Sequence, residues 1–537
     1  MKKTLSISIA VVAFVAIGAV LPGFGCTVYM DFHSPPDAGG AGGGGGGGCE
    51  PGTVAPCYAG PEGTENVGLC KAGEQTCNPD GIGFGPCDGA VLPRTEDCAT
   101  PTDEDCDGLA PSCSGTPIWS KRFGDDKEQY AVRVVANSAG DVLVAGDFVG
   151  SVDFGGGPMV SGTAGDSFIV KLDGAVGEHR WSKQFGDTAN LYDPLIAVDG
   201  LDNVLVVGTL WGSLDFGDGP IQSAGDGDVL VAKFDSAGNY LWAKSFGDVG
   251  SQRGNGIAVD NAGNIVVTGA FSGSVDFGGG PLTSAGDSDV FIVKFDTDGE
   301  WVWNRRFGDT NSQEGENVAM DQTGNVLVAG SFAGTVDFGG GPLTAPLVDV
   351  FTIKLDAFGD HIWSRRVGAS YIAVSVDKVG DALFTGYFSG TLDFGGESLV
   401  SAGGGDLFVG KMDSSQNPVF SRSFGDDSDQ VGLSIAADTS GNLLLTGFFR
   451  GAINFGDGPI ASAGALDILL AKLDASGNPL WSKRFGDAAT DQAGMSVAFD
   501  KFGNALLAGT FYGTVDFGNG PLVSAGGNDI FVAKFTP

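Results

Sequence analysis

The chain has 537 residues, of which 92 are glycine, and its 66 acidic residues against 29 basic ones give a formal net charge of −37. Such a charge repels nucleic acid and anionic lipid headgroups, so we exclude DNA and RNA as partners. The hydrophobic fraction of 42% with 18% charged residues is that of a folded protein, which excludes a disordered acidic polymer.

The N-terminus has the pattern of an export signal, which we assign to residues 1–25. Lys2 and Lys3 precede an apolar run that ends at Leu21, and Gly25 stands directly before Cys26. A small residue before a cysteine resembles the signal of bacterial lipoproteins, and this resemblance implies that Cys26 is lipidated. Gly23 departs from it, because such signals usually carry Leu there. Ordinary secretion and a retained membrane anchor therefore stay open.

Residues 26–48 are rich in glycine, and we expect them to form a flexible tether. A cysteine-rich module follows over residues 49–113. An even number of cysteines in an exported segment predicts four disulfides, but the spacing does not fix their pairing. Few large aliphatic residues occur here, so the module depends on cross-links. Its cysteines are Cys49, Cys57, Cys70, Cys77, Cys87, Cys98, Cys106 and Cys113.

This module also holds the best single candidate metal site of the sequence. The phrases CYAGPEGTENVGLCKAGEQTCNPDG and EDCATPTDEDCDG resemble cysteine-rich modules of bacterial surface proteins that are described as metal-binding. Asp103, Asp105 and Asp107 follow the D-x-D-x-D-G pattern that opens a calcium loop. The twelfth position is Ser114, so an EF-hand is not expected. Calcium is the only candidate cofactor, and the alternative is a solvated acidic loop.

The remainder, residues 117–537, is a repeat array. A phrase close to W-S-K-R-F-G-D recurs at intervals of 57 to 62 residues, beginning at positions 119, 181, 242, 303, 363, 420 and 481. Each unit alternates four apolar strands with turns such as Asp260–Gly263, where Asp accepts backbone N–H bonds and Gly takes positive φ. Four antiparallel strands form one propeller blade. We therefore predict an all-β fold, a seven-bladed β-propeller preceded by a small disulfide-rich module.

The ends of the array predict how the ring closes. The last unit stops after its third strand, Asp529–Phe535, whereas the first begins with a lone strand of the fourth type, Trp119–Phe123. Pairing these two strands would complete the seventh blade and leave no terminal edge. The phrases D-V-F-I-V-K-F-D and A-V-D-N-A-G-N-I-V-V-T-G resemble the bacterial SBBP family of propeller repeats. That resemblance implies a fold and an extracellular location, but no single activity.

Three sets of residues recur around the ring, and we interpret them as structural rather than as ligand sites. They are an Asp before each third strand with a Lys five residues later, the leading Trp, and the Asp of the phrase V-D-F-G-G-G, for which calcium binding is the alternative. The first set comprises Asp166, Asp228, Asp289, Asp349, Asp406, Asp467 and Asp529 with Lys171, Lys233, Lys294, Lys354, Lys411, Lys472 and Lys534. The others are Trp119, Trp181, Trp242, Trp303, Trp363 and Trp481, and Asp153, Asp215, Asp276, Asp337, Asp393 and Asp516, with Asn454 in the sixth blade.

Function is expected where the repeats differ. Two long connections per blade must emerge on one face of the ring, and variable loops there favour binding of a protein or glycan partner. The fifth unit departs most, because V-G-A-S-Y ending at Tyr371 replaces the F-G-D phrase; a pocket and a tolerated deletion are both open. Only His179 and His361 occur in the array, beside the tight turns. The sequence thus favours a non-enzymatic, exported and membrane-anchored binding module, and the alternative is an enzyme acting on polysaccharide.

Overall fold

The computed structural model describes residues 49–60, 64–92, 115–163, 165–186, 190–395 and 398–537, which fall into two compact units, 49–92 and 115–537. Every regular element in these ranges is a β-strand. In the described part of the chain no helix is long and apolar enough to span a membrane. Cys26, the three aspartates of the calcium pattern, Cys98, Cys106 and Cys113 lie outside the described residues, as do the predicted signal and tether.

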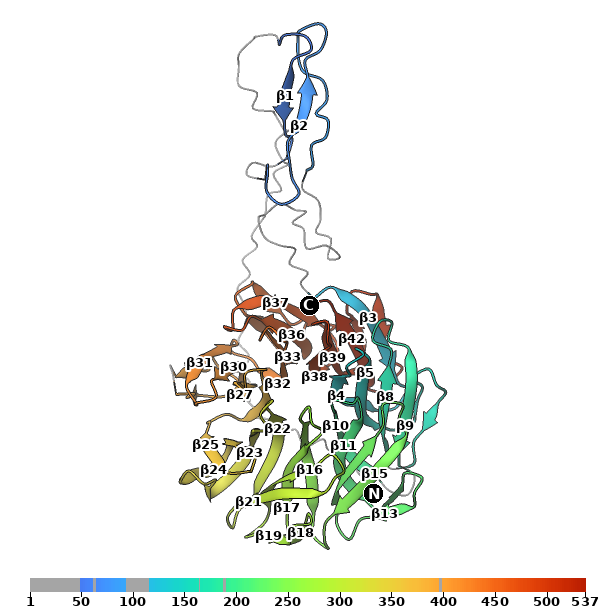
Figure 1. Ribbon diagram of the computed structural model, residues 1–537, viewed down its shortest axis with the longest axis vertical. Coiled ribbons are helices and arrows are strands. Elements are labelled where there is room, and N and C mark those ends of the chain that lie inside the picture. The colour runs from blue at the N-terminus through green and yellow to red at the C-terminus, as the bar shows by residue number, and fades with distance from the viewer. Residues whose placement is uncertain (1–48, 61–63, 93–114, 164, 187–189, 396–397) are drawn as a thin grey trace, which may run out of the picture. The chain divides into compact units, whose positions relative to one another are not determined.

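The second unit is the predicted seven-bladed propeller (Figure 1). Each blade is a four-stranded antiparallel sheet whose strands we denote A to D from the centre outward. Blades one to four consist of β4 (Gln129–Ala136), β5 (Val142–Phe148), β8 (Asp166–Leu172) and β9 (His179–Phe185); β10 (Asn190–Val198), β11 (Val204–Trp211), β14 (Asp228–Phe234) and β15 (Tyr240–Phe246); β16 (Gln252–Val259), β17 (Ile265–Phe271), β20 (Asp289–Phe295) and β21 (Trp301–Phe307); and β22 (Gln313–Met320), β23 (Val326–Asp337), β24 (Pro342–Leu355) and β25 (His361–Arg366).

Blades five to seven repeat this order. They consist of β26 (Tyr371–Val376), β27 (Ala382–Phe388), β30 (Asp406–Met412) and β31 (Pro418–Phe424); β32 (Gln430–Ala437), β33 (Leu443–Phe449), β36 (Asp467–Leu473) and β37 (Pro479–Phe485); and β38 (Gln492–Phe499), β39 (Ala505–Phe511), β42 (Asp529–Phe535) and β3 (Pro117–Phe123).

The seventh blade confirms the predicted closure. Strand β3 pairs antiparallel with β42, with Trp119 opposite Lys534 and Phe123 opposite Ile530. In Figure 1 the cyan β3 lies beside the red β42, so the two ends of the array share one sheet. The guanidinium of Arg122 pairs with the buried carboxylate of Asp529. The ring is therefore held by a strand from its beginning added to strands from its end.

The core lies between blades rather than within them. Strands B and C are apolar on both faces; in blade three every residue of β17 and β20 is buried. Seven clusters of buried residues occur among the described residues, and each contains side chains from two neighbouring sheets. A sheet that is covered on both faces must carry such nearly continuous apolar strands. Strand D, the outer edge of each sheet, is more exposed; in β21 of blade three only Trp303 is buried.

The connection between strands B and C contains structure that the sequence did not predict. In six blades the V-D-F-G-G-G segment forms a two-stranded hairpin, and in blade four it continues strands β23 and β24. The Phe of each hairpin packs into the core; the ring of Phe277, for example, lies tilted against that of Phe291, with 4.9 Å between ring centroids. The hairpins are β6 (Ser151–Val152) with β7 (Met159–Val160), β12 (Ser213–Asp215) with β13 (Pro220–Gln222), β18 (Ser274–Asp276) with β19 (Pro281–Thr283), β28 (Thr391–Leu392) with β29 (Leu399–Val400), β34 (Ala452–Asn454) with β35 (Pro459–Ala461), and β40 (Thr514–Asp516) with β41 (Pro521–Val523).

The antiparallel order gives the ring two unlike faces. The A–B turns of all seven blades and the C–D turns of blades one to six emerge on one, which we call the tight-turn face. The B–C and D–A connections emerge on the other, the long-loop face. On the tight-turn face an Asp caps each short turn except the A–B turn of blade one, which Asn137 caps; Oδ1 of Asp260, for example, accepts the N–H groups of Ala262 and Asn264. This repeated capping leaves sequence variation to the long-loop face.

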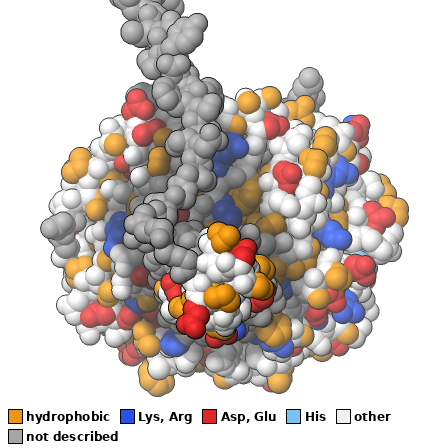
Figure 2. All heavy atoms as spheres, turned by 90° about the horizontal axis from the view of Figure 1, so that it is seen from above, with side chains coloured by type: hydrophobic (Ala, Val, Ile, Leu, Met, Phe, Trp, Pro, Cys, Tyr) orange, Lys and Arg blue, Asp and Glu red, His pale blue; other side chains and the backbone are white. Residues whose placement is uncertain are grey.

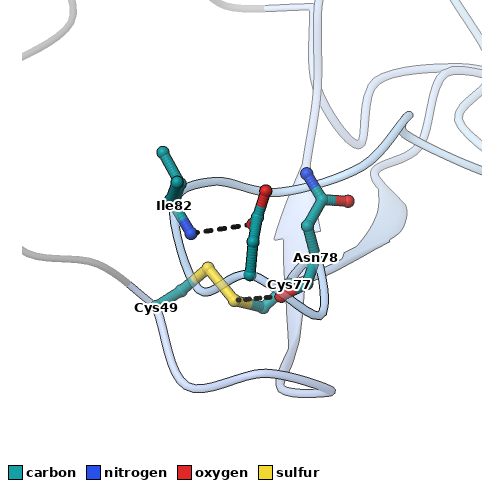
Figure 3. The surroundings of a disulfide bond; sticks show 5 residues. Cys49, Cys77, Asn78 and Ile82 are labelled. Carbon is teal, nitrogen blue, oxygen red and sulfur yellow. Dashed lines mark hydrogen bonds between the residues drawn. A yellow bond between two sulfur atoms is a disulfide. The ribbon is translucent and has the colours of Figure 1, made fainter.

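The first unit is small and cross-linked. Its strands β1 (Val54–Cys57) and β2 (Gly73–Thr76) form one antiparallel ribbon. Disulfides join Cys49 to Cys77 and Cys57 to Cys87, and Cys70 is disulfide-bonded as well. Figure 3 shows the first of these bonds beside a turn in which Asp80 accepts the N–H of Ile82. Two of the four predicted disulfides are thus confirmed, with their pairing.

Candidate binding site at the inner strands

The Asp and Lys residues that recur in every blade are used inside the protein. All fourteen are at most 9% exposed. Six of the seven lysines form an ion pair with an Asp of their own A–B turn; Lys233 Nζ lies 3.0 Å from Asp199 Oδ2 and also donates to the carbonyl of Thr297 in the next blade. Lys294 donates instead to two backbone carbonyls of the next blade. Five of the seven lysines therefore link neighbouring blades, because they donate to a backbone carbonyl of the next blade: Lys171, Lys233, Lys294, Lys354 and Lys534.

The Asp residues of the same set hold strand C to strand D. In four blades the carboxylate pairs with an arginine of strand D, as Asp289 does with Arg306 at 2.5 Å. The same carboxylate accepts the N–H of Ala285 four residues earlier. Because these groups are buried and their interactions lie within the ring, they offer no surface to a ligand.

The V-D-F-G-G-G aspartates cap their own glycine turns. Oδ1 of Asp276 accepts the N–H groups of Gly278 and Gly280 at 2.8 and 3.0 Å. In blade six Asn454 makes the same two bonds with an uncharged side chain. Since an amide does the same work, the recurrence of Asp at this position is explained without an ion. No group of three or more Asp, Glu, His or Cys side chains in the described ranges is arranged to hold a metal.

The leading tryptophans lie between blades. Trp119, Trp303, Trp363 and Trp481 are buried, and Trp181 and Trp242 are partly buried against the clusters of the following blade. The indole of Trp119 covers Gly177, whose φ of 69° and lack of a side chain admit the ring, and its Nε1 donates to a backbone carbonyl at 3.2 Å. His179 and His361 each bond a serine hydroxyl of their own strand at 3.1 Å.

A different set of side chains remains at the centre of the ring. We define the inner-strand cluster as Asp147 of β5, Asp193 of β10, Arg253 of β16, Glu316 of β22 and Tyr371 of β26. Each lies in the half of its strand that is nearest the long-loop face. All five keep contact with solvent, and Asp193 and Arg253 are exposed. The five residues come from five consecutive blades. Asp193 lies within electrostatic reach of Asp147 and of Arg253, and Glu316 lies within electrostatic reach of Tyr371.

Asp147 and Asp193 form one half of the inner-strand cluster. The Ser167 hydroxyl donates to Asp147 Oδ1 at 2.5 Å, and the backbone N–H of Asp193 bonds the same carboxyl. Burial nevertheless raises the pKa of Asp147 to about 7. The surrounding protein also raises the pKa of Asp193, although its side chain touches solvent, and the Arg253 guanidinium opposes that shift. Asp193 has a φ of 52°, which is strained for a residue other than glycine.

Glu316 and Tyr371 form the other half. Burial raises the pKa of Glu316 to about 7, against a hydrogen bond from Ser331. Burial, with the nearby Glu316 charge, raises the pKa of Tyr371 to about 12. Its hydroxyl lies within electrostatic reach of Arg133, a residue of blade one. Neither Arg133 nor Arg253 forms a hydrogen bond or ion pair with another described residue, so both guanidinium groups can bind a ligand.

These raised pKa values predict an unusual dependence of stability on pH. Between about pH 4.5 and pH 7 the folded chain holds protons on Glu316 and Asp147 that the unfolded chain, with carboxyl pKa values near 4, has released. Stability therefore falls as the pH rises through this window. We expect Glu316→Gln to flatten the decline of the thermal midpoint, measured at half-unit steps of pH. The same slope in the variant would contradict the assignment.

The sequence contained one signal for this site that the repeat analysis missed. In five blades a buried Gln at the start of strand A donates to an Asp four or five residues earlier, as Gln252 does to Asp248 at 2.9 Å. The position is occupied by Leu191 in blade two and by Ser370 in blade five, where the next residue, Tyr371, lies opposite Tyr387. These two blades supply Asp193 and Tyr371 to the inner-strand cluster. The absence of the repeated Gln in blades two and five thus marks the two blades whose inner strands differ from the other five.

Figure 2 shows hydrophobic, acidic and basic side chains scattered over the visible surface of the propeller, with no single kind gathered into one patch. The inner-strand cluster is therefore identified from its individual residues and the burial of their side chains, and not from a patch of one kind of side chain.

Comparison with known proteins supports the fold and leaves the family open. No family model matches the chain. It is 21% identical to the uncharacterized WD repeat-containing protein L264 of Acanthamoeba polyphaga mimivirus, over 73% of this chain and 36% of that protein. It is 28% identical to the regulatory protein FlaEY of Caulobacter vibrioides, over 33% of this chain and 18% of that protein. The chain thus spans about a third or less of these relatives.

Solved structures give distant similarity only. A protein of unknown function from Dyadobacter fermentans matches 79% of the chain and 99% of its own, at 12% identity and a TM-score of 0.38. An ulvan lyase, a polysaccharide lyase, matches 76% of the chain and 97% of its own, at 12% identity and a TM-score of 0.39. The chain is a seven-bladed β-propeller that is similar in sequence to a WD-repeat protein and carries a disulfide-bonded N-terminal unit.

Proposed function

We propose that this protein is an exported, lipid-anchored binding module of the cell surface whose ligand, a protein or a glycan, contacts the inner-strand cluster from the long-loop face. One observation carries the proposal. The residues that recur in all blades bond to one another inside the ring, whereas the inner-strand cluster holds charged and aromatic groups that occur once each and keep contact with solvent. Any specificity must come from groups that the ring itself does not use.

The proposed location is supported by the chemistry of the first unit. Disulfides persist in oxidising compartments, and two of them cross-link a unit with very little apolar core. A lipid on Cys26 would hold the chain to a membrane, and residues 26–48 would give the folded units reach. Calcium at Asp103, Asp105 and Asp107 remains part of this proposal as a stabiliser of the cysteine-rich unit.

A photo-crosslinking experiment tests the proposed face. A benzophenone amino acid replaces either Val249, in the D–A connection before blade three, or Leu201, in the A–B turn of blade two. The two side chains are matched controls because they are 82% and 80% exposed on opposite faces. With an envelope extract of the cells that express the protein, adducts are expected from position 249 only. Equal adducts from both positions, or adducts from position 201 alone, would refute a long-loop binding face.

A second candidate function, cleavage of polysaccharide, is favoured by one observation. Asp147 lies beside Asp193, and a carboxyl whose pKa is near 7 next to a second carboxylate suits a general acid in glycosidic chemistry. Incubation of the intact protein with soluble glucan, chitosan and peptidoglycan is expected to release no reducing ends. Release that Asp147→Asn abolishes, while Asp276→Asn leaves it intact, would replace the binding module by an enzyme.

A further inference from the structure

Trp211 is a tryptophan that the propeller does not use for packing between blades. Six of the eight tryptophans occupy the repeated position in strand D, and Trp301 covers the hairpin glycines Gly278 and Gly279. Trp211 instead ends strand B of blade two, where the other blades carry Val149, Ser272, Ala333, Ser389, Arg450 and Tyr512. Its side chain is 41% exposed, and its Nε1 has no partner among the described residues. The largest apolar side chain is thus left open at this one position.

The surroundings of Trp211 combine aromatic and charged groups. The ring of Tyr192 lies 6.4 Å from the indole between centroids, at an interplanar angle of 82°. Asp193 follows Tyr192 directly, and its left-handed backbone is part of a two-residue bulge that interrupts the pairing of β10 with β11. Arg253 of the next blade lies within electrostatic reach of Asp193. A strained bulge that carries an exposed carboxylate directly after the tyrosine in contact with the open indole is a feature of a binding site rather than of packing.

We propose that Trp211, Tyr192, Asp193 and Arg253 form a subsite for a neutral glycan chain, and this inference rests on the proposed binding function of the long-loop face. The C–H face of a pyranose ring stacks on an exposed indole, and its hydroxyls bond to carboxylate, guanidinium and indole N–H groups. A polyanionic glycan fits less well because Asp193 stands in the site and the chain carries a net charge of −37. A neutral chain meets no such repulsion.

Isothermal titration of the intact protein tests the inference with three probes: chitohexaose, cellohexaose and hexagalacturonate. We expect at least one neutral hexasaccharide to bind and hexagalacturonate not to bind. Trp211→Ala should weaken binding by about tenfold or more, as for loss of a central aromatic contact. Trp301→Ala is the matched control, because Trp301 is also 41% exposed but lies on the outer strand of blade three, and it should leave the affinity unchanged.

Thermal unfolding of each variant controls for folding, and Tyr192→Leu provides a second, milder change in the same subsite. Absence of binding by both neutral glycans, equal affinity of wild type and Trp211→Ala, or tighter binding of hexagalacturonate would each overturn the inference. The crosslinking experiment separates this failure from that of the proposed function. Protein adducts from position 249 without glycan binding would refute only the glycan subsite, whereas adducts from the tight-turn face would refute the proposed face itself.

Discussion

Deletion of Pro117–Phe123 is expected to lower the unfolding midpoint of the propeller more than any other deletion of seven residues near the N-terminus. The deletion removes strand β3, whose Trp119 and Phe123 are 6% and 8% exposed. Loss of a buried tryptophan alone costs about 3–5 kcal/mol. It also leaves the Asp529 carboxylate buried without Arg122, and it opens an edge on β42. The seventh blade then lacks its outer strand, and the ring is no longer closed by pairing of its two ends.

The control for this experiment is deletion of residues 42–48, seven consecutive glycines of the predicted tether. That deletion removes no strand of the propeller, and we expect an unchanged midpoint in differential scanning calorimetry of the mature protein. A similar midpoint for the two deletions would mean that β3 contributes nothing to ring closure and would refute the pairing as a stabilising feature.

The second large effect is expected at a buried lysine that links two blades. Lys233→Met removes the partner of Asp199 in a pair whose side chains are 5% and 2% exposed. An uncompensated buried carboxylate costs about 3–5 kcal/mol, so the free energy of unfolding in urea should fall by that amount. The double substitution Lys233→Met with Asp199→Asn should recover part of the loss, because the amide retains the turn bonds without the charge.

Lys127 is the matched control for this pair. It contacts Asp126 at 3.1 Å, but the two side chains are 55% and 70% exposed. Lys127→Met should change the free energy of unfolding by less than about 0.5 kcal/mol. Equal losses in Lys127→Met and Lys233→Met would show that burial of the repeated lysine has no energetic consequence, contrary to its proposed role between blades.

The fold was predictable because its determinants are local and occur seven times. The turn Asp260–Gly263 carries its own capping Asp and its left-handed Gly, so each hairpin is encoded in a few residues. Closure by β3 was predictable from the missing fourth strand of the last unit. The hairpins of the B–C connection were not predicted. Their strands have only two or three residues, as in Ser274–Asp276, and the glycines and the exposed Asp beside them are typical of a loop.

The candidate site was harder to predict because its residues belong to different repeats. Asp193, Glu316 and Tyr371 are more than 50 residues apart in the sequence, and only closure of the ring brings their blades around one centre. Each occurs once, so it carries no periodic signal. The long-loop face and the irregular fifth unit were predicted, and Tyr371 lies there. The proposed role of Trp211 was not predicted, because a tryptophan at the end of a strand is normally expected to be buried in the hydrophobic core.

Hydrogen–deuterium exchange of the intact protein, with and without the neutral glycans of its own cell envelope, tests the binding site most directly. Protection is expected in peptides that cover residues 190–196, 204–211 and 252–256, at the long-loop ends of blades two and three. The tight turns at 199–203 and 377–381 should exchange at unchanged rates. Protection confined to those turns, with unchanged exchange in the inner strands, would contradict the account.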